Sequence, residues 1–417
     1  MRILHVIGSL DESSGGPAQA CVGLCRELAR RGENVSIYSL NGKYLEAGRI
    51  GRVAAPLYTP VRRHGVEIRY FPYSGTRYYV WSVPLAMTLY KDVPHFDIVH
   101  IHSVYSFHFG AASLACRRFG VPYLVRLHGT LDPYVRNQRR LRKYLHALVI
   151  DRWALAGAAA VHFTAQEEME DAVGAQYETG FRDLQRRAVV IPNGVDVPQL
   201  ESRGQMDLAT QSLLARFPEL RAKRVVLFLG RLDRQKGLDI ISDAFGRICK
   251  VRDDVQLVIA GPDNDNYGHK IRKQLIALGV ARQVTFTGML LGAEKSAAFR
   301  MADVFVLPSY GENFAIAAVE AMAHGLAVVI SNRVKIWREI AAARAGTVIN
   351  CDAAELADAI GRLLDDNHSR REMGERGRQL VTTRFSWPTV AGQVLDLYRS
   401  IASASRPPLE GVGGLAL

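Results

Sequence analysis

The chain has 417 residues, of which 48% are hydrophobic and 23% charged, an ordinary globular composition that allows two or three domains with ample cores. A formal net charge of +12 favours an anionic partner, either a phosphate compound, an acidic lipid surface or nucleic acid. No zinc-finger, helix-turn-helix or RNA-recognition pattern accompanies this charge, and no run of about 18 apolar residues occurs, so we expect neither nucleic-acid binding nor a membrane span.

The first half of the chain alternates apolar, strand-like runs with segments of helical period, which predicts a parallel α/β domain over residues 1–197. The run at 2–8 is too short for a signal peptide and is expected to be the first strand. The five cysteines contain no C-x-x-C pair, so we expect no disulfide and a reducing, cytoplasmic location. Further strands are expected at 34–40, 97–102, 123–127, 158–163 and 188–191, with helices at 18–31, 107–119 and 134–156 and a helix opened by the capping-box spacing of Thr164 and Glu167.

The second half of the chain repeats this alternation after a polar segment, 198–222, which we interpret as the connection between two domains. The new series predicts another parallel α/β domain over 223–385, and a break at Phe385–Pro388 precedes a last helix at 386–402. Proline and glycine in 403–417 predict disorder. Strands of the second domain are expected at 224–229, 255–260, 284–287, 304–308, 327–331 and 346–349.

The most informative stretch is 308–322, which carries two carboxylates separated by seven mostly apolar residues. Gly311 is expected to turn the chain after a buried strand, placing Glu312 at a helix start and Glu320 about two turns in. The N–H groups from Gly311 to Phe314 would then form an anion site. Carboxylates that accept hydroxyl hydrogens beside such a site suit a ligand with sugar and phosphate groups, whereas two solvated helix acids are the alternative.

Two further motifs follow strands at the carboxyl end, where open α/β sheets bind ligands. Gly15 and Gly16 lie between the first strand and a helix and would let a phosphate approach the backbone, although a plain turn is the alternative. The absence of G-x-G-x-x-G argues against a dinucleotide cofactor. Arg231 and Lys236 follow the first strand of the second domain and are placed to grip a diphosphate, with a solvated basic loop as the alternative.

His128 follows the strand at 123–127 and could present its ring or its backbone carbonyl to a bound sugar, with a core or surface histidine as the alternative. No metal is expected. His100, His102 and His128 lack the accompanying carboxylate motif of a metal site. The segment from Asp263 resembles the start of a calcium loop, but no glutamate follows at loop position twelve.

The helix expected at 134–156 carries cations on one side and an apolar stripe on the other. A solvated face is the ordinary interpretation of such a helix. The excess of one sign makes an anionic membrane surface or an anionic acceptor the competing one. The cations concerned are Arg136, Arg139, Arg140, Arg142 and Lys143.

With these motifs in order, the chain resembles glycosyltransferase family 4, group 1, the retaining nucleotide-sugar transferases. The resemblance spans nearly the whole chain and rests on the E-x7-E motif of Glu312 and Glu320, combined with Gly230–Leu232 and Lys236–Gly237. It implies two facing Rossmann-like domains, the glycosyltransferase B architecture, with the active site in the interdomain cleft. It also implies a last helix that crosses back onto the first domain.

The resemblance assigns roles to the candidate residues. Glu312 would contact the hydroxyls of the donor sugar and Glu320 those of the ribose. Arg231 and Lys236 would hold the diphosphate, and His128 would lie over the sugar near the reacting carbon. The remaining donor-binding residues would be Gly15, Gly16, Gly311, Asn313, Phe314 and Ala315, of which Ala315 stands where many relatives have glycine.

The implied activity is metal-independent, cofactor-free transfer of a hexose, with a mannose-type donor favoured, from a nucleoside-diphosphate sugar to a saccharide acceptor. A polyprenyl-diphosphate-linked acceptor at the inner membrane would fit bacterial surface polysaccharide assembly. A nucleotide-sugar epimerase and a non-catalytic nucleotide-sugar-binding protein share the architecture and are the alternatives. The complete E-x7-E motif together with Arg231 and Lys236 favours transfer.

Overall fold

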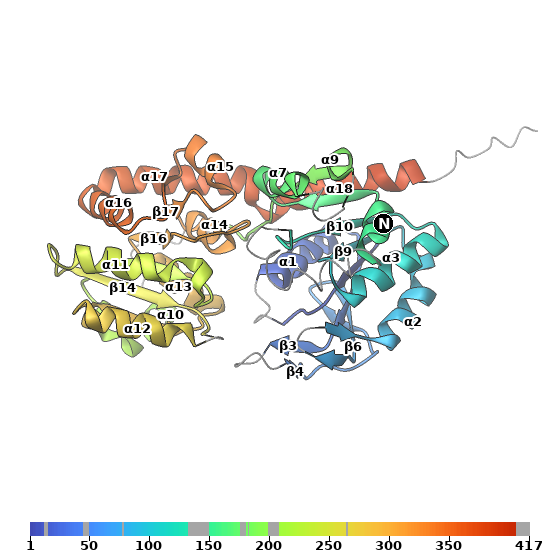
Figure 1. The fold of residues 1–417 in the computed structure, drawn as a ribbon, viewed down its shortest axis with the longest axis horizontal. Helices are drawn as coiled ribbons and strands as arrows, with labels where there is room; N and C mark the ends of the chain where they lie inside the picture. Colours follow the sequence, from blue (N-terminus) through green and yellow to red (C-terminus); the bar gives the residue numbers. More distant parts are fainter. Residues whose placement is uncertain are drawn as a thin grey trace, which may run out of the picture.

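The computed structural model describes residues 1–11, 16–44, 50–76, 79–131, 150–175, 181, 183–198, 208–263 and 266–405. The chain forms two α/β domains that lie side by side along the long axis of the molecule, the first coloured blue to green and the second yellow to orange (Figure 1). Each domain is built on a mainly parallel sheet with helices packed against it. This is the two-domain α/β class that the sequence predicts.

The first domain contains a sheet with the strand order β12-β11-β10-β9-β1-β2-β6-β5, parallel except for the edge pair β5–β6. Its central strands are buried on both faces, as uninterrupted apolar runs predict. The strands are β1 (Arg2–Ile7), β2 (Asn34–Leu40), β5 (Val61–Arg63), β6 (Val66–Phe71), β9 (Ile98–His102), β10 (Tyr123–Arg126), β11 (Ala160–Phe163) and β12 (Ala188–Val190). The helices are α1 (Gly16–Arg30), α2 (Val83–Asp92), α3 (Phe107–Phe119), α6 (Arg152–Ala156), α7 (Gln166–Gly174) and α9 (Leu184–Arg187).

The region 42–92 contains elements that the sequence analysis did not predict. Two hairpins, β3 (Gly42–Tyr44) with β4 (Ile50–Arg52) and β7 (Ser74–Thr76) with β8 (Tyr79–Trp81), have strands too short for alternation to reveal. Helix α2 did carry a start signal in the sequence, the serine at position 82. In the structure Ser82 Oγ accepts the N–H of Leu85 at 3.2 Å, as an N-cap serine does.

The second domain contains a fully parallel sheet with the order β15-β14-β13-β16-β17-β18. The strands are β13 (Arg224–Leu229), β14 (Val255–Ala260), β15 (Val284–Gly288), β16 (Val304–Leu307), β17 (Ala327–Ser331) and β18 (Gly346–Ile349). The helices are α10 (Leu208–Arg216), α11 (Leu238–Ile248), α12 (Tyr267–Ala277), α13 (Gly292–Met301), α14 (Ile316–Ala323), α15 (Trp337–Ala342), α16 (Ala353–Asp365) and α17 (Asn367–Leu380).

Three expectations about segment boundaries are wrong. The segment 208–220 belongs to the second domain rather than to a linker, because Leu213 of α10 and Leu220 are buried in that domain's core. Helix α7 begins at Gln166, and Thr164 bonds through its N–H and hydroxyl to Glu168 instead of Glu167. The last helix, α18 (Trp387–Ser405), includes the first residues of the expected disordered tail, whose remainder lies outside the described residues.

Helix α18 returns from the second domain and packs on the first, as the family resemblance implies. Figure 1 shows α17 and α18 following one another along the same side of both domains. Trp387 and Tyr398 are buried among residues of α1 and β1 in the first domain's core. The two chain crossings between the domains are hydrogen-bonded to each other, since Val195 N–H donates to Phe385 O at 2.8 Å and Trp387 N–H donates to Val195 O at 3.2 Å.

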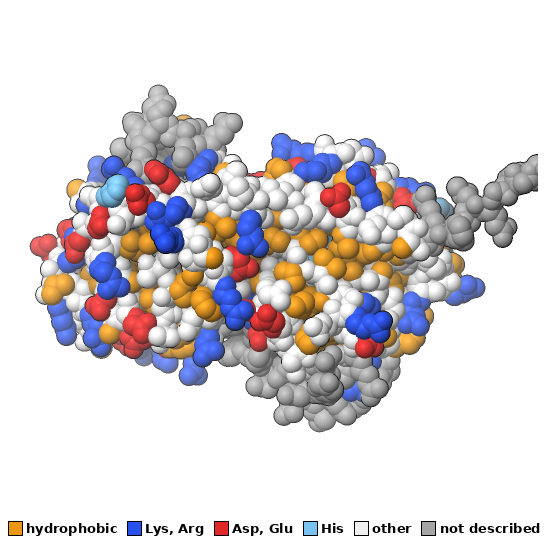
Figure 2. Space-filling model, turned by 90° about the horizontal axis from the view of Figure 1, so that it is seen from above, with side chains coloured by type: hydrophobic (Ala, Val, Ile, Leu, Met, Phe, Trp, Pro, Cys, Tyr) orange, Lys and Arg blue, Asp and Glu red, His pale blue; other side chains and the backbone are white. Residues whose placement is uncertain are grey.

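The described part of the chain holds no helix with both the length and the apolar character that crossing a membrane requires. On the face shown in Figure 2, Lys and Arg side chains are scattered over both domains rather than gathered in one patch. The net charge of +12 therefore gives this face no single cationic surface.

The packing of Trp387 between two glycines leads to a stability prediction. A Cβ added at Gly23 of α1 or at Gly194 would lie 2.1 or 2.2 Å from ring atoms of Trp387, far inside normal contact. We expect Gly23→Ala to lower the free energy of unfolding by about 1–3 kcal/mol, because overpacking forces buried side chains to move. Denaturant unfolding measures this change.

The matched control is Gly361→Ala in α16, where an added Cβ meets no atom within 4 Å. That change should stabilise the protein by about 0.5–1 kcal/mol, since alanine favours a helix over glycine. A Gly23→Ala protein as stable as the wild type would contradict the close packing of Trp387 between the two glycines.

Candidate active site

A pocket of about 420 Å³ opens between the two domains, at the carboxyl ends of their strands. This is where open parallel sheets bind ligands. The first domain contributes Gly16 of α1, His128 and Gly129 after β10, and Asn193 after β12. The second domain contributes Gly230, Arg231 and Lys236 after β13, Gly261 after β14, Leu291 and Lys295 after β15, and Gly311, Glu312, Asn313, Phe314, Ala315 and Glu320 after β16. The structure thus brings the described candidate residues into one pocket.

Glu312 lies in the loop after β16, where its carboxylate forms an ion pair with the ammonium group of Lys236. Both side chains are largely buried, at 18% and 17% exposure. The expected position of Glu312 at a helix start is wrong. Its N–H donates to Arg333 O at 3.1 Å and its carbonyl accepts from Lys335 N–H at 3.0 Å, so the loop is pinned to the segment after β17.

Glu320 lies on α14, and its carboxylate is 2.6 Å from Nζ of Lys295 on α13. Sequence reasoning missed Lys295. A signal was present, because Lys295 follows the strand β15 at the start of a helix, much as Lys236 follows β13. Each carboxylate of the E-x7-E motif therefore has its own lysine in the pocket, which gives the site two cations and two hydroxyl acceptors.

The N-terminus of α14 points into the pocket, four residues later than the sequence predicted. The N–H groups of Phe314, Ala315 and Ile316 bond to no group in the described part of the chain. Open N–H groups and the helix dipole together favour an anion at this end. Phe314 is 3% exposed as a residue and its ring packs against Phe385, so its side chain is not available to a ligand.

Ala315 occupies the left-handed backbone region, with φ of 54°. A Cβ in this region costs about 1–2 kcal/mol, which explains why glycine suits the position. We expect Ala315→Gly to leave the free energy of unfolding unchanged or to raise it by up to about 1 kcal/mol, since relief of the strain offsets the added freedom of the unfolded chain.

The control for this change is Ala359→Gly in the middle of α16, which should destabilise the protein by about 0.5–1 kcal/mol or more. Thermal unfolding of both variants makes the comparison. Equal destabilisation by the two substitutions would show that Ala315 is not strained.

The backbone around Lys236 is fixed by a short 3-10 turn, η6 (Arg234–Lys236). Asp233 caps the turn by accepting the N–H of Gln235 at 2.9 Å. Gly237 follows with φ of 71°, and a Cβ there would lie 2.2 Å from Pro308 O, so only glycine fits. Arg231 is more open, with 55% of its side chain exposed and Asp233 at 3.7 Å, and is free to turn toward a phosphate.

His128 follows β10 and lies across the pocket from the second domain. Its Nε2 is 2.8 Å from His102 Nδ1, and the neighbouring Gly129 N–H donates to Glu168 at 2.8 Å. Burial, and then the charge of Arg126, lower the pKa of His128 well below its usual value, so the ring stays neutral. Asn313 of the second domain approaches the same loop and donates to Thr164 Oγ1 at 2.9 Å, which bridges the domains.

The remaining residues that the sequence singled out are Gly15, Gly16, the cations at 136–143 and Asp263. Gly15 and the cations at 136–143 lie outside the described residues. Gly16 opens α1, and a Cβ there would be 3.3 Å from Ile316 of α14. Asp263 accepts the N–H of Gly268 at 3.1 Å.

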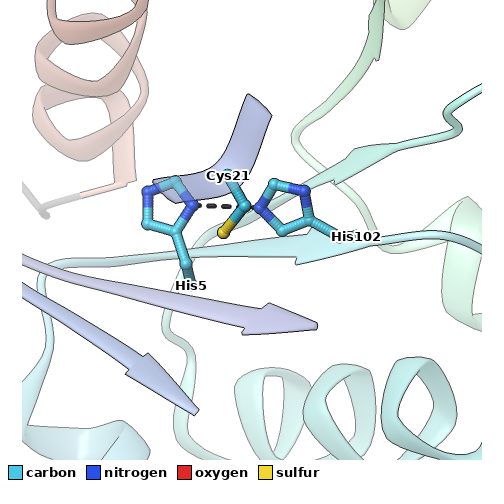
Figure 3. Close-up of side chains that lie close together, drawn as sticks. All are labelled: His5, Cys21 and His102. Carbon is cyan, nitrogen blue, oxygen red and sulfur yellow. Dashed lines mark hydrogen bonds between the residues drawn. The ribbon is translucent and has the colours of Figure 1, made fainter. Parts of the chain in front are cut away.

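One group of buried side chains has ligand types that a metal ion could use. His5, Cys21 and His102 place one ligand atom each within 4.8 Å of one another (Figure 3). His5 Nδ1 and His102 Nε2 are 3.0 Å apart and form a hydrogen bond, and the buried guanidinium of Arg126 adds positive charge nearby that opposes a cation. The arrangement therefore fits a hydrogen-bonded ring pair better than a metal site.

The fold is similar to that of solved structures. Anabaena HepE, solved in complex with UDP and glucose, superposes with a TM-score of 0.73 over 96% of this chain and 100% of its own, at 17% identity. That likeness establishes the glycosyltransferase B architecture. Two family models match the chain. The model described as "Glycosyltransferase Family 4" matches residues 14–199, and the model described as "Glycosyl transferases group 1" matches residues 214–380.

Curated relatives agree with these matches. The phosphatidyl-myo-inositol mannosyltransferase of Mycobacterium leprae is 37% identical over 220 residues, 52% of this chain and 54% of that protein. The Mycolicibacterium smegmatis protein of the same name is 31% identical over 318 residues, 74% of this chain and 72% of its own. The chain thus spans about half the length of the first of these relatives and nearly three quarters of the second. It belongs to the group 1 glycosyltransferases of family 4.

Proposed function

We propose that the protein is a retaining hexosyltransferase that moves a sugar, of mannose type or another hexose, from a nucleoside-diphosphate donor to a saccharide acceptor. The names of the two mycobacterial relatives support transfer to a lipid-borne acceptor, and HepE with bound UDP supports a nucleotide donor. A polyprenyl-diphosphate-linked saccharide would place the enzyme in bacterial surface polysaccharide biosynthesis, at the cytoplasmic face of the inner membrane.

The observation that carries this proposal is the pairing of each E-x7-E carboxylate with a lysine in one pocket. Lys236 pairs with Glu312, and Lys295 pairs with Glu320. When such a pair separates, its carboxylate and its ammonium group each need a new hydrogen-bonding partner, and a nucleotide sugar offers both. Its hydroxyls donate to the carboxylates, and its phosphate oxygens accept from the ammonium groups. Neither a purely apolar ligand nor a simple anion would use all four groups.

The proposed mechanism needs no metal, because fixed positive groups can stabilise the departing diphosphate. As the bond between the sugar carbon and the diphosphate breaks, negative charge grows on the leaving oxygen. Arg231, Lys236 and the N–H groups at the α14 N-terminus line the pocket and would bind it. The acceptor hydroxyl would attack from the same face and give its proton to a phosphate oxygen. The new glycosidic bond then keeps the configuration of the donor.

The experiment that tests this function incubates the protein in EDTA with GDP-mannose, UDP-glucose or UDP-galactose, with and without a polyprenyl-diphosphate-linked saccharide. Nucleoside diphosphate release and the NMR signal of the product's anomeric proton are the readouts. We expect acceptor-dependent release and a product that retains the donor configuration. Glu375→Ala, an exposed carboxylate change on α17, serves as the control that keeps activity.

Other outcomes identify the alternatives. A donor whose sugar changes configuration without glycoside formation would indicate an epimerase. Binding without any product would indicate a non-catalytic protein. An inverted anomer, or activity abolished by EDTA and restored by manganese, would overturn the proposed mechanism.

We also propose that the cationic segment at 136–143 meets an anionic membrane or the acceptor's diphosphate. Replacing Arg139, Arg140 and Arg142 by serine should weaken binding to phosphatidylglycerol vesicles, as measured by co-sedimentation. The binding free energy should fall by roughly 1 kcal/mol for each cation removed. Serine at the exposed Lys270, Lys273 and Arg282 removes the same charge from the second domain and should have little effect. If both triple variants sediment alike and the acceptor KM is unchanged, the segment is simply a solvated face.

A further inference from the structure

A chain of hydrogen-bonded rings runs from His128 in the pocket through the first domain to α18. His128 Nε2 is 2.8 Å from His102 Nδ1, and His102 Nε2 is 3.0 Å from His5 Nδ1, the link that Figure 3 shows. His5 Nε2 is 3.4 Å from the hydroxyl of Tyr398, which is in turn 2.6 Å from His100 Nδ1. The pocket is therefore connected to the helix that returns from the second domain.

The rings behind His128 are enclosed by protein. His5, His100, His102 and Tyr398 are each 0% exposed. Burial lowers the pKa of His100 and of His102 well below the usual value, so these rings stay neutral. A cluster of polar rings in a core is unfavourable unless its members bond to one another, and apolar side chains would fill the same space at lower cost. The cluster thus suggests a role beyond stability.

The sheet brings these residues together through its register. His100 and His102 are two residues apart on β9, so their side chains point to the same face of the sheet. His5 of β1 pairs directly with His100. Tyr398 reaches that face from α18. His162 on β11 is a separate case, because its Nε2 bonds to the carbonyl of Ile191 at 2.8 Å rather than to another ring.

Hydrogen bonding through the neutral rings of His102 and His128 gives the chain a direction. A neutral imidazole carries one hydrogen and one lone pair, so a ring that accepts at one nitrogen donates with the other. The hydrogens between His5 and His128 must therefore all point the same way. The nitrogen of His128 that carries hydrogen is then set by His102, and the tautomer of His102 is set by His5.

We propose that His102, His5 and Tyr398 are positioning residues that hold the His128 ring in one tautomer and one orientation beside the donor sugar. The role at the sugar rests on the proposed function, whereas the fixed tautomer does not. A ring with a fixed tautomer offers the sugar either a donor or an acceptor at its free nitrogen, never a mixture. Because Tyr398 belongs to α18, docking of that helix completes the chain behind the active site.

The tautomer is measured without substrate. Protein labelled with ¹⁵N in its 12 histidine rings gives two-bond proton–nitrogen spectra that distinguish the tautomers, and loss of one signal set in His128→Gln assigns that residue. We expect one tautomer for His128 in the wild type and a mixture or the opposite tautomer in His102→Leu. His162→Gln removes a buried histidine outside the chain and should leave His128 unchanged.

Kinetics then test the role at the sugar. His102→Leu should lower kcat by about 10-fold or more, as loss of a group that orients a functional histidine does, with little change in donor KM. His102→Gln should recover part of this loss, because an amide offers one donor and one acceptor. Where the leucine variant does not fold, Tyr398→Phe breaks the chain at its far end with a minimal change in packing and should shift the His128 signals in the same direction.

Three other outcomes contradict the proposal. An unchanged His128 tautomer in the folded variants would overturn the positioning role even if activity fell. A changed tautomer with wild-type kcat would overturn its importance at the sugar. Stoichiometric zinc in the purified protein would also overturn it, since a metal between His5 and His102 would replace their hydrogen bond. A wild-type protein that turns over no donor would contradict the proposed function and leave the tautomer result standing.

Discussion

Lys236→Ala is expected to lower kcat by about 10²–10³-fold, the usual effect of removing one preorganised group that stabilises charge in a transition state. Lys236 is the cation held closest to Glu312 in the pocket, on a turn whose backbone is fixed by Asp233 and Gly237. Its charge becomes available to the diphosphate when the ion pair with Glu312 separates. Steady-state kinetics in EDTA measure the loss, and Arg231→Ala should show a loss of similar kind.

The control for Lys236→Ala is Lys273→Ala on α12, an exposed lysine away from the pocket. It should retain wild-type kcat. Thermal unfolding of both variants separates a catalytic loss from a folding defect, because Lys236→Ala also leaves the Glu312 carboxylate without its partner. A folded Lys236→Ala enzyme with wild-type kcat would exclude a role for this lysine in leaving-group stabilisation.

The second large effect is expected at the two carboxylates, which should differ in kind. Glu312→Ala should lower kcat by about 10–100-fold, since a hydrogen bond to a charged group contributes about 1.5–3 kcal/mol and we propose that this one is made to the reacting sugar. Glu320→Ala should raise donor KM more than it lowers kcat, because Glu320 lies deeper on α14 where the ribose is expected. Kinetics with a saturating acceptor measure both parameters.

Paired lysines provide the comparison for these carboxylates. Lys295→Ala should resemble Glu320→Ala in raising donor KM, and Lys236→Ala should resemble Glu312→Ala in lowering kcat. Identical kinetic changes in the two glutamate variants would contradict the separate roles of sugar and ribose contacts.

Outside the region 42–92, the sequence predicted the strands well and the loops between them poorly. The bounds of β2 and β13 agree with the expected ranges because buried parallel strands are uninterrupted apolar runs. The loop of Glu312 was misplaced because its conformation depends on hydrogen bonds to Arg333 and Lys335, which follow a different strand. Contacts between distant segments leave no periodic signal in the sequence.

The same limit applies within the candidate site. Lys295 was missed because its importance depends on α13 lying beside α14, which local pattern does not show. Of the hydrogen-bonded ring chain, the sequence analysis singled out only His128 and the two histidines of β9, His100 and His102. Its other links come from β1 and from Tyr398, 393 residues away from His5 in sequence. The departure at Ala315, in contrast, was visible in the sequence, and its left-handed backbone shows why glycine suits the position.

The central claim is that the pocket between the two domains binds a nucleoside diphosphate through fixed cations. Calorimetric titration of the protein with UDP, GDP and ADP in EDTA tests it most directly. We predict that at least one of them binds at one site per chain, that Lys236→Ala and Lys295→Ala each weaken this binding about 10-fold or more, and that Lys273→Ala does not. Absence of binding by all three nucleotides, or binding that neither pocket lysine affects, would contradict the account.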